Sequence, residues 1–164
     1  MDFEIFNNQT IYTLPDIELL SLAKYHFNTS EDTQFSDSTS TSSLDISSDS
    51  LQDKKGNIHK GTAIINFCFL DSTKESDLKC MPNNFRGIKD GEVVHFESFN
   101  ALYFDIVDEN SGKPLYIRKG SSVGLNIPVS STNFGEDTYF WEFRNGNWQI
   151  IQKINAKDLQ NRGG

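Results

Sequence analysis

The last third of the chain, residues 96–152, is a series of short apolar segments separated by turn-forming residues. Within residues 100–108, apolar side chains recur at every second position, which is the period of an extended strand. Residues 109–112 favour a turn, because Asn tolerates a positive φ and Gly adopts one without steric cost. The same alternation recurs at 114–118 and 123–129. We therefore predict an antiparallel β-meander over this part of the chain.

Two dipeptides predict tight hairpins. Asp90-Gly91 precedes the predicted strand 92–96, and Asn145-Gly146 separates the predicted strands 138–143 and 148–151. Both dipeptides suit a two-residue turn whose central residues need positive φ. The second one is expected to fix the register of the final hairpin.

Residues 61–70 are predicted to form a long strand that is apolar on both faces. One face carries Ala63, Ile65, Phe67 and Phe69, and the other carries Ile64, Cys68 and Leu70. Such a strand is typical of the middle of a sheet covered on two sides, or of an interface with a partner.

The N-terminal segment, residues 1–29, contains one predicted helix at residues 16–27. Pro15 suits the first turn of a helix, and acidic residues near the start and basic residues near the end complement the helix dipole. Its apolar residues form one stripe at helical spacing: Leu19, Leu22, Ala23 and Phe27. We expect this segment to pack on the β-domain.

Residues 30–57 differ in composition, because they are rich in Ser, Thr and Asp with only isolated apolar residues. Such a segment buries too little apolar surface to offset the entropy cost of ordering, so it is predicted to be a flexible loop or linker. Residues 58–153 are predicted to form the β-sandwich and 154–164 a tail. The expected fold class is all-β, mainly an antiparallel β-sandwich, with one short N-terminal helix and a long flexible loop.

Charge excludes a nucleic-acid partner, because the formal net charge is −8 and the Lys and Arg residues are scattered singly. No stretch approaches the ~20 apolar residues of a membrane span. The first residues lack the basic and apolar regions of a secretory signal, so the chain as written is expected in the cytoplasm.

Groups suited to catalysis are sparse. Cys68 and Cys80 have no histidine at metal-ligand spacing, and they are either free thiols or one disulfide. Free thiols fit better, because Cys68 lies in an apolar run. The presence of a thiol and of His95 alone does not predict a Cys-His catalytic dyad. The carboxylates Asp105 and Asp108 suit solvated positions rather than acid–base catalysis. The sequence therefore assigns no catalytic, cofactor-binding or metal-ligating residue.

Five aromatic residues are candidate contacts for a ligand or a partner. They are Tyr103, Tyr116, Tyr139, Trp141 and Trp148. If they are exposed on one sheet face, they form a platform on which a glycan can stack; if they are buried, they are core residues, and core packing is the favoured interpretation.

The chain ends in Arg162-Gly163-Gly164, as ubiquitin-like modifiers do. Such modifiers need a helix that crosses the sheet after the first hairpin, and residues 58–153 contain no helical pattern of that length. A frayed terminus is therefore the favoured interpretation, with a ubiquitin-like modifier as a remote alternative.

A spaced series of residues carries a family likeness over residues 58–152. The series is Phe96-Glu97-Ser98, Phe104, Ile106, Gly112-Lys113-Pro114-Leu115, Ile117, Gly120, Leu125, Ile127-Pro128, Phe140, Gly146 and Trp148. It resembles the β-sandwich modules of surface-associated proteins of the Bacteroidetes. More distantly, it resembles the ZU5 and UPA tandem sandwich and the ectodomains of cartilage-intermediate-layer proteins.

The resemblance implies a structural or binding role at a cell surface and supplies no catalytic residue. Autoprocessing in some ZU5-UPA proteins needs a Phe-Ser pair, whereas this chain has Phe96-Glu97-Ser98, so self-cleavage is not expected. We expect a non-enzymatic structural or protein-binding module in a larger assembly, with a protein partner or a homo-oligomer. A carbohydrate-binding module that takes a glycan is the alternative.

Overall fold

The structure is a computed structural model that describes residues 22–36, 42–71, 73–80, 86–95, 100–127, 138–144 and 147–153. The chain forms two compact units. Unit 1 comprises residues 1–9, 21–69 and 102–128, and unit 2 comprises residues 10–20, 70–101 and 129–164. The fold is mostly β, as predicted, and the one helix in the described ranges is α1 (Glu75–Leu78).

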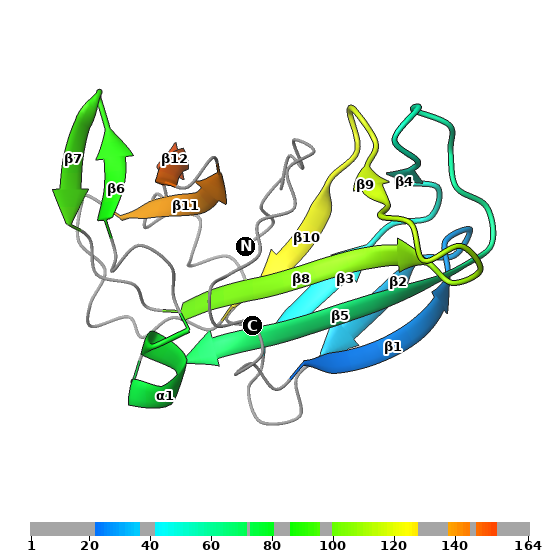
Figure 1. Cartoon of the computed structure of the whole chain (residues 1–164), viewed down its shortest axis with the longest axis horizontal. Coiled ribbons are helices and arrows are strands. Elements are labelled where there is room, and N and C mark those ends of the chain that lie inside the picture. Colours follow the sequence, from blue (N-terminus) through cyan, green and yellow to red (C-terminus); the bar gives the residue numbers. More distant parts are fainter. Residues whose placement is uncertain are drawn as a thin grey trace, which may run out of the picture. The chain divides into compact units, whose positions relative to one another are not determined.

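The first sheet of unit 1 has the strand order β1-β5-β8 (Figure 1). Its members are β1 (Ala23–Asn28), β5 (Thr62–Asp71) and β8 (Asn100–Asp108). β1 pairs antiparallel to β5, with Tyr25 opposite Ile65 and Phe27 opposite Ala63. The long strand predicted at residues 61–70 is therefore confirmed as the centre of a sheet.

The second sheet of unit 1 has the order β10-β3-β2 and is antiparallel throughout. Its members are β2 (Thr33–Ser36), β3 (Ser43–Ile46) and β10 (Val123–Asn126). A short antiparallel ribbon joins β4 (Leu51–Gln52) to β9 (Tyr116–Ile117).

The two sheets pack face to face, so unit 1 is a β-sandwich. Phe35 of β2 lies 5.2 Å from Phe27 of β1 and 6.0 Å from Phe67 of β5, measured between ring centroids. On β5 the side chains of Ala63, Ile65 and Phe67 are almost fully buried. The opposite face of β5 is half-buried from Thr62 to Cys68, and Leu70 near its end is buried.

Unit 2 contains one four-stranded sheet of order β11-β12-β6-β7. Its members are β6 (Arg86–Lys89), β7 (Glu92–His95), β11 (Tyr139–Arg144) and β12 (Asn147–Lys153). β6 pairs antiparallel with β7, and β11 pairs antiparallel with β12. The central contact is parallel, with Trp148 opposite Gly87.

Both predicted hairpins are present. Asp90 and Gly91 have φ values of 53° and 83°, as a two-residue turn between β6 and β7 requires. Arg144 pairs with Asn147, so β11 and β12 also form a hairpin with two connecting residues, although the predicted turn residues Asn145-Gly146 themselves lie outside the described residues.

The helix predicted at residues 16–27 is wrong over its second half, because residues 23–27 belong to strand β1. Residues 16–21 lie outside the described residues. Phe27 is buried against Phe35, and Tyr25 stacks on Phe67 with ring centroids 5.7 Å apart. These side chains lie two residues apart on one face of a strand, and pairing with β5 overrides the weak helical preference.

The flexible loop predicted at residues 30–57 is also wrong, because this segment contributes β2, β3 and β4. Its few apolar residues are nearly all buried in unit 1. They are Phe35, Leu44, Ile46 and Leu51, each at most 5% exposed. Residues 37–41 of this segment, like the predicted tail 154–164, lie outside the described residues.

The predicted β-meander is wrong except for its last hairpin and the predicted turn after β8, where the Leu115 N–H donates to the Ile106 carbonyl and Val107 bridges antiparallel to Pro114. The strands β8, β9 and β10 pair with β5, β4 and β3, in that nested order, rather than with one another. Residues on both sides of position 58 therefore share sheets, and residues 58–153 are divided between the two units.

Candidate functional site

A partly buried chain of polar contacts lies at one end of the sandwich in unit 1. The Thr29 hydroxyl lies 3.1 Å from His59 Nδ1, and His59 Nε2 lies 3.1 Å from Asp108 Oδ1. A hydroxyl, an imidazole and a carboxylate in this order form the arrangement of a nucleophilic triad. No local sequence pattern indicates this arrangement, because Thr29 and His59 are 30 positions apart and His59 and Asp108 are 49 apart.

The position of Thr29 argues against a role as a nucleophile. Its side chain belongs to a residue that is only 1% exposed, so a substrate has no route to the hydroxyl. The hydroxyl also lies 3.1 Å from the carbonyl oxygens of both His59 and Gly61, which share its single hydrogen as acceptors. The three side chains therefore tie together the β1–β2 turn, the β4–β5 connection and the end of β8.

Asp108 also organises the turn that follows β8. Its Oδ2 accepts hydrogen bonds from the Ser111 hydroxyl at 2.5 Å and from the Ser111 backbone N–H at 3.1 Å. The Ser111 hydroxyl, and then the His59 side chain, lower the pKa of Asp108 to about 2. Next to it, Glu109 Oε1 lies 2.7 Å from His26 Nδ1 of β1.

The low pKa of Asp108 predicts a stability change in acid. The folded-state pKa is below the ordinary value of 3.8, so the stabilisation is complete above that pH and is lost as the pH falls toward 2. In a Ser111→Ala variant we expect the pKa of Asp108, measured by NMR titration, to rise toward 3.8. The variant should be less stable than the natural protein near neutral pH and equally stable in strong acid.

A matched control for this experiment is Ser48→Ala, which changes another exposed serine with no contact to Asp108. This variant should leave the titration of Asp108 unchanged. An Asp108 carboxyl that titrates at the same pH with and without the Ser111 hydroxyl would contradict the assigned cause.

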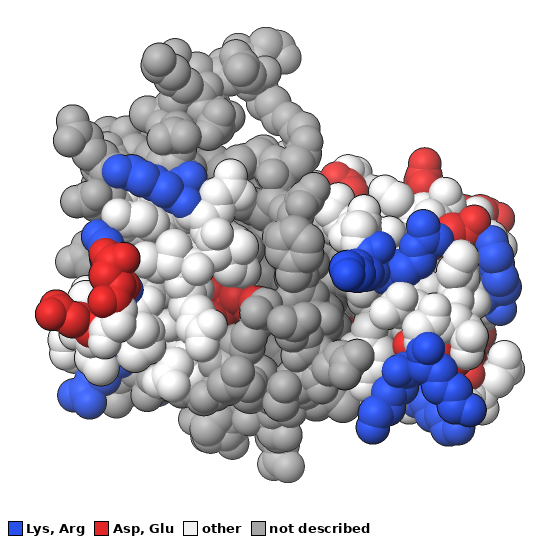
Figure 2. Space-filling view, turned by 90° about the horizontal axis from the view of Figure 1, so that it is seen from above, with Lys and Arg blue, Asp and Glu red and all other residues white. Residues whose placement is uncertain are grey.

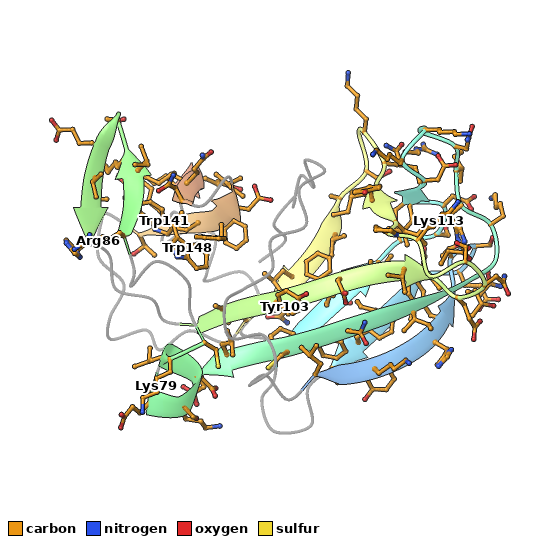
Figure 3. The ribbon with its side chains drawn as sticks, viewed as in Figure 1. Lys79, Arg86, Tyr103, Lys113, Trp141 and Trp148 are labelled. Atoms are coloured by element: carbon orange, nitrogen blue, oxygen red, sulfur yellow. The ribbon has the colours of Figure 1, made fainter. Side chains whose placement is uncertain are left out.

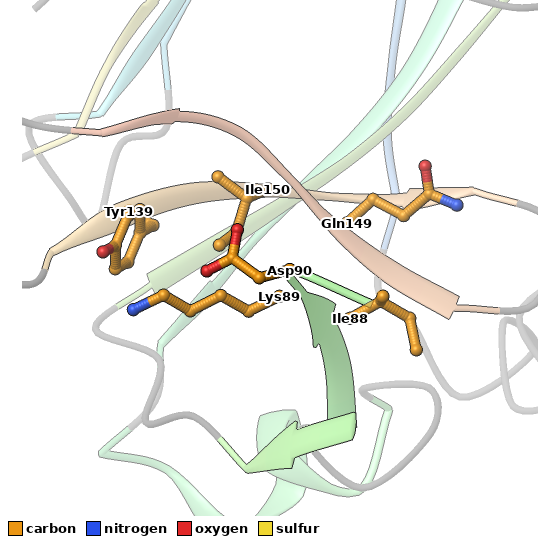
Figure 4. Close-up of a pocket in the computed structure, with 6 residues that line it drawn as sticks. All are labelled: Ile88, Lys89, Asp90, Tyr139, Gln149 and Ile150. Atoms are coloured by element: carbon orange, nitrogen blue, oxygen red, sulfur yellow. The ribbon is translucent and has the colours of Figure 1, made fainter. Parts of the chain in front are cut away.

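A shallow cleft of about 460 Å³ lies over the β6–β7 turn of unit 2 (Figure 4). It is lined by Ile88, Lys89, Asp90, Tyr139, Gln149 and Ile150. The ammonium of Lys89 lies 4.6 Å from the centre of the Tyr139 ring, and that of Lys153 lies 6.0 Å from it. The cleft thus combines one aromatic ring with a carboxylate, an amide and a cation.

The strand beside this cleft, β7, is the last strand of its sheet among the described residues. Val93 in its middle is 65% exposed, the highest value among the exposed large apolar residues of the described ranges. Glu92 and His95 are exposed as well. A strand with free backbone groups and an exposed apolar side chain is a template for pairing with another chain.

The five candidate aromatic residues are divided between the two units. Tyr103 and Tyr116 belong to unit 1, whereas Tyr139, Trp141 and Trp148 belong to unit 2. Tyr116 is only 9% exposed, and burial, with a smaller contribution from Asp105, raises the pKa of Tyr103 to about 12. The three residues of unit 2 are half-buried.

The two tryptophans of unit 2 make intramolecular aromatic contacts. Trp148 lies edge-on to Phe143 with ring centroids 5.4 Å apart, and Trp141 lies edge-on to Tyr139 at 6.3 Å. Figure 3 shows that Trp141 and Trp148 come from the paired strands β11 and β12. Packing therefore accounts for much of their surface.

Other chemistry is limited in the parts of the chain that the structure describes. Cys68 and Cys80 are not joined in a disulfide. In these ranges no three His, Cys, Asp or Glu side chains gather into a metal site, and no helix is long and apolar enough to cross a membrane. On the face shown in Figure 2, positive and negative side chains of the described residues are interspersed.

Comparison with models of protein families, with curated proteins and with solved structures finds no match. The family resemblance noted in the sequence therefore stays a prediction.

Proposed function

We propose that the protein is a non-enzymatic structural or protein-binding β-module that works as a component of a larger assembly. The observation that supports this most is the edge of β7, where an apolar side chain is 65% exposed at Val93. Exposed apolar groups on a strand edge are usually avoided, because they favour pairing with other chains. When a partner strand pairs with such an edge, the edge serves as a binding site.

The arrangement of polar groups supports the same proposal. In unit 1 the hydroxyl–imidazole–carboxylate series holds three chain segments together and keeps its hydroxyl buried. Its groups therefore stabilise the fold rather than face a substrate. A surface-associated location accords with the resemblance to surface modules and belongs to the same proposal.

The test is to measure the mass of the purified chain over a wide concentration range and to identify proteins that crosslink to it in its native lysate. We expect either self-association or a reproducible partner. A chain that stays monomeric at every concentration and crosslinks to nothing would overturn the proposal.

The cleft supports one second candidate, carbohydrate binding. Sugars stack on aromatic rings and bond to carboxylates and amides, and Tyr139, Asp90 and Gln149 supply these groups. Trp141 lies 6.3 Å from Tyr139, so its fluorescence should change when a sugar binds. The expected result is a saturable change that Tyr139→Ala abolishes; no change with any oligosaccharide and no binding on a glycan array would remove this candidate.

A further inference from the structure

We infer that the outer edge of β7 binds an extended, basic segment of a partner protein, which pairs antiparallel to β7 as a fifth strand of the four-stranded sheet. This inference rests on the proposed protein-binding function and names the surface and the chemistry of the partner.

The register of the hairpin shows which backbone groups of β7 point outward. Lys89 and Glu92 flank the two-residue turn and pair directly, so their N–H and C=O groups face each other. The pairs of an antiparallel ladder alternate, so Val93, opposite Ile88, points its N–H and C=O away from β6. His95 does the same two residues later. Among the described residues no strand pairs with this side of β7.

The side chains on this edge favour an apolar neighbour. Residues directly opposite each other in a ladder share a face, so Val93 lies on the same face as Ile88, which lines the cleft. A β-branched residue of a partner strand opposite Val93 would cover its exposed surface. β7 itself carries no Pro and no Lys, the residues that commonly protect an edge.

The charges favour a basic partner. Asp90 and Glu92 are both exposed at the turn end of β7. The ammonium of Lys89, opposite Glu92, lies 4.6 Å from the centre of the Tyr139 ring, so Glu92 can face a second cation on the open side. Opposite charges directly across a strand pair stabilise the pairing.

The same charges argue against a second copy of the chain as the occupant. Each copy carries a net charge of −8. Symmetric antiparallel pairing about Val93 would also bring the two Glu92 carboxylates to diagonal positions on one face, where like charges repel. The partner segment should therefore read, from its N-terminus, an apolar residue opposite Val94, a β-branched residue opposite Val93, and Lys or Arg opposite Glu92.

The test uses a capped peptide with the core Thr-Val-Val-Lys and the matched peptide Thr-Val-Val-Glu, titrated into the whole chain and followed by amide NMR. We expect the Lys peptide to bind more tightly, with the Val93 and His95 amides shifted and protected from hydrogen exchange. In Glu92→Lys the preference should reverse toward the Glu peptide.

Val93→Pro is the sharpest variant, because proline removes only an outward-pointing N–H and leaves the bonds to β6 in place. We expect it to weaken binding of the Lys peptide by at least about tenfold, equivalent to ~1.4 kcal/mol. Val93→Thr keeps the N–H and should weaken binding less. The fluorescence of Trp141 and Trp148, both in unit 2, reports whether each variant is folded.

The inference would be overturned if Val93→Pro and Glu92→Lys, both folded, bound the Lys peptide as the natural chain does, or if dimerisation through β7 occurred instead. The proposed function is tested by a separate outcome. If a native partner crosslinks equally well to Val93→Pro, the protein still binds a partner, but through a surface other than the edge of β7. Loss of that crosslink in Val93→Pro, with the peptide preference reversed in Glu92→Lys, would support both.

Discussion

Replacing Phe35 by alanine should destabilise unit 1 by about 3–5 kcal/mol, the range for truncating a buried Phe. Phe35 is 5% exposed, and its ring lies within 6.0 Å of the rings of Phe27, Phe67 and Tyr25, measured between centroids. These residues come from β1, β2 and β5, so the cavity would open between the two sheets of the sandwich. A domain with a total stability of about 5–15 kcal/mol would lose a large part of it.

The measurement is urea unfolding followed by far-UV circular dichroism, because both tryptophans belong to unit 2 and do not report on unit 1 directly. The control is Ser36→Ala, an exposed change at the next position of the same strand, which should cost at most about 0.5 kcal/mol. If Phe35→Ala cost no more than Ser36→Ala, the segment around β2 would not be part of the core.

Local sequence pattern predicted the strands that carry either a long apolar run or a clear alternation of apolar residues. The two-faced run 61–70 became β5, and the alternation at 100–108 became β8, because each pattern lies within one strand. The turn at Asp90-Gly91 was predictable for a similar reason, since positive φ is a property of the residue itself.

Local sequence pattern did not predict the strands whose burial depends on residues that are far away in the chain. The residues 30–57 have low average hydropathy, yet their single apolar residues each lie on the inward face of a short strand. Pairing order was also unpredictable: β3 pairs with β10 across about half the chain, and nothing local in either strand specifies the other. Register and partner are fixed by which faces become buried together.

The candidate sites show the same division. An exposed aromatic platform was the alternative to core packing, and nothing in the sequence shows that Tyr103 and Tyr116 belong to unit 1 whereas Tyr139, Trp141 and Trp148 belong to unit 2. The contacts of His59 with Thr29 and Asp108 join residues with no sequence relationship. The exposure of Val93 depends on β7 being the last strand of its sheet, which is a property of the pairing order and not of the strand itself.

Gly87 in β6 gives the second large effect, because the Trp141 ring lies directly on it. A Cβ at residue 87 would overlap Trp141 Cζ3, with Cε3 at 2.9 Å and Cη2 at 3.0 Å. The rigid indole cannot move aside as a flexible side chain would, so Gly87→Ala should destabilise unit 2 by about 1–3 kcal/mol. An aromatic ring that covers a glycine in a sheet replaces the packing that a side chain would supply.

The sign of the change in the free energy of unfolding distinguishes this clash from the general effect of replacing a glycine. At an unobstructed position with compatible backbone, Gly→Ala stabilises by about 0.4–1 kcal/mol, because it restricts the unfolded chain. In a Trp141→Leu background the ring is absent, so Gly87→Ala should become neutral or stabilising, with a coupling energy of about 1–3 kcal/mol in the double-mutant cycle. Urea unfolding followed by the fluorescence of Trp148, which is present in all four proteins, measures each corner of the cycle. Equal destabilisation by Gly87→Ala in both backgrounds would show that Trp141 does not lie on β6.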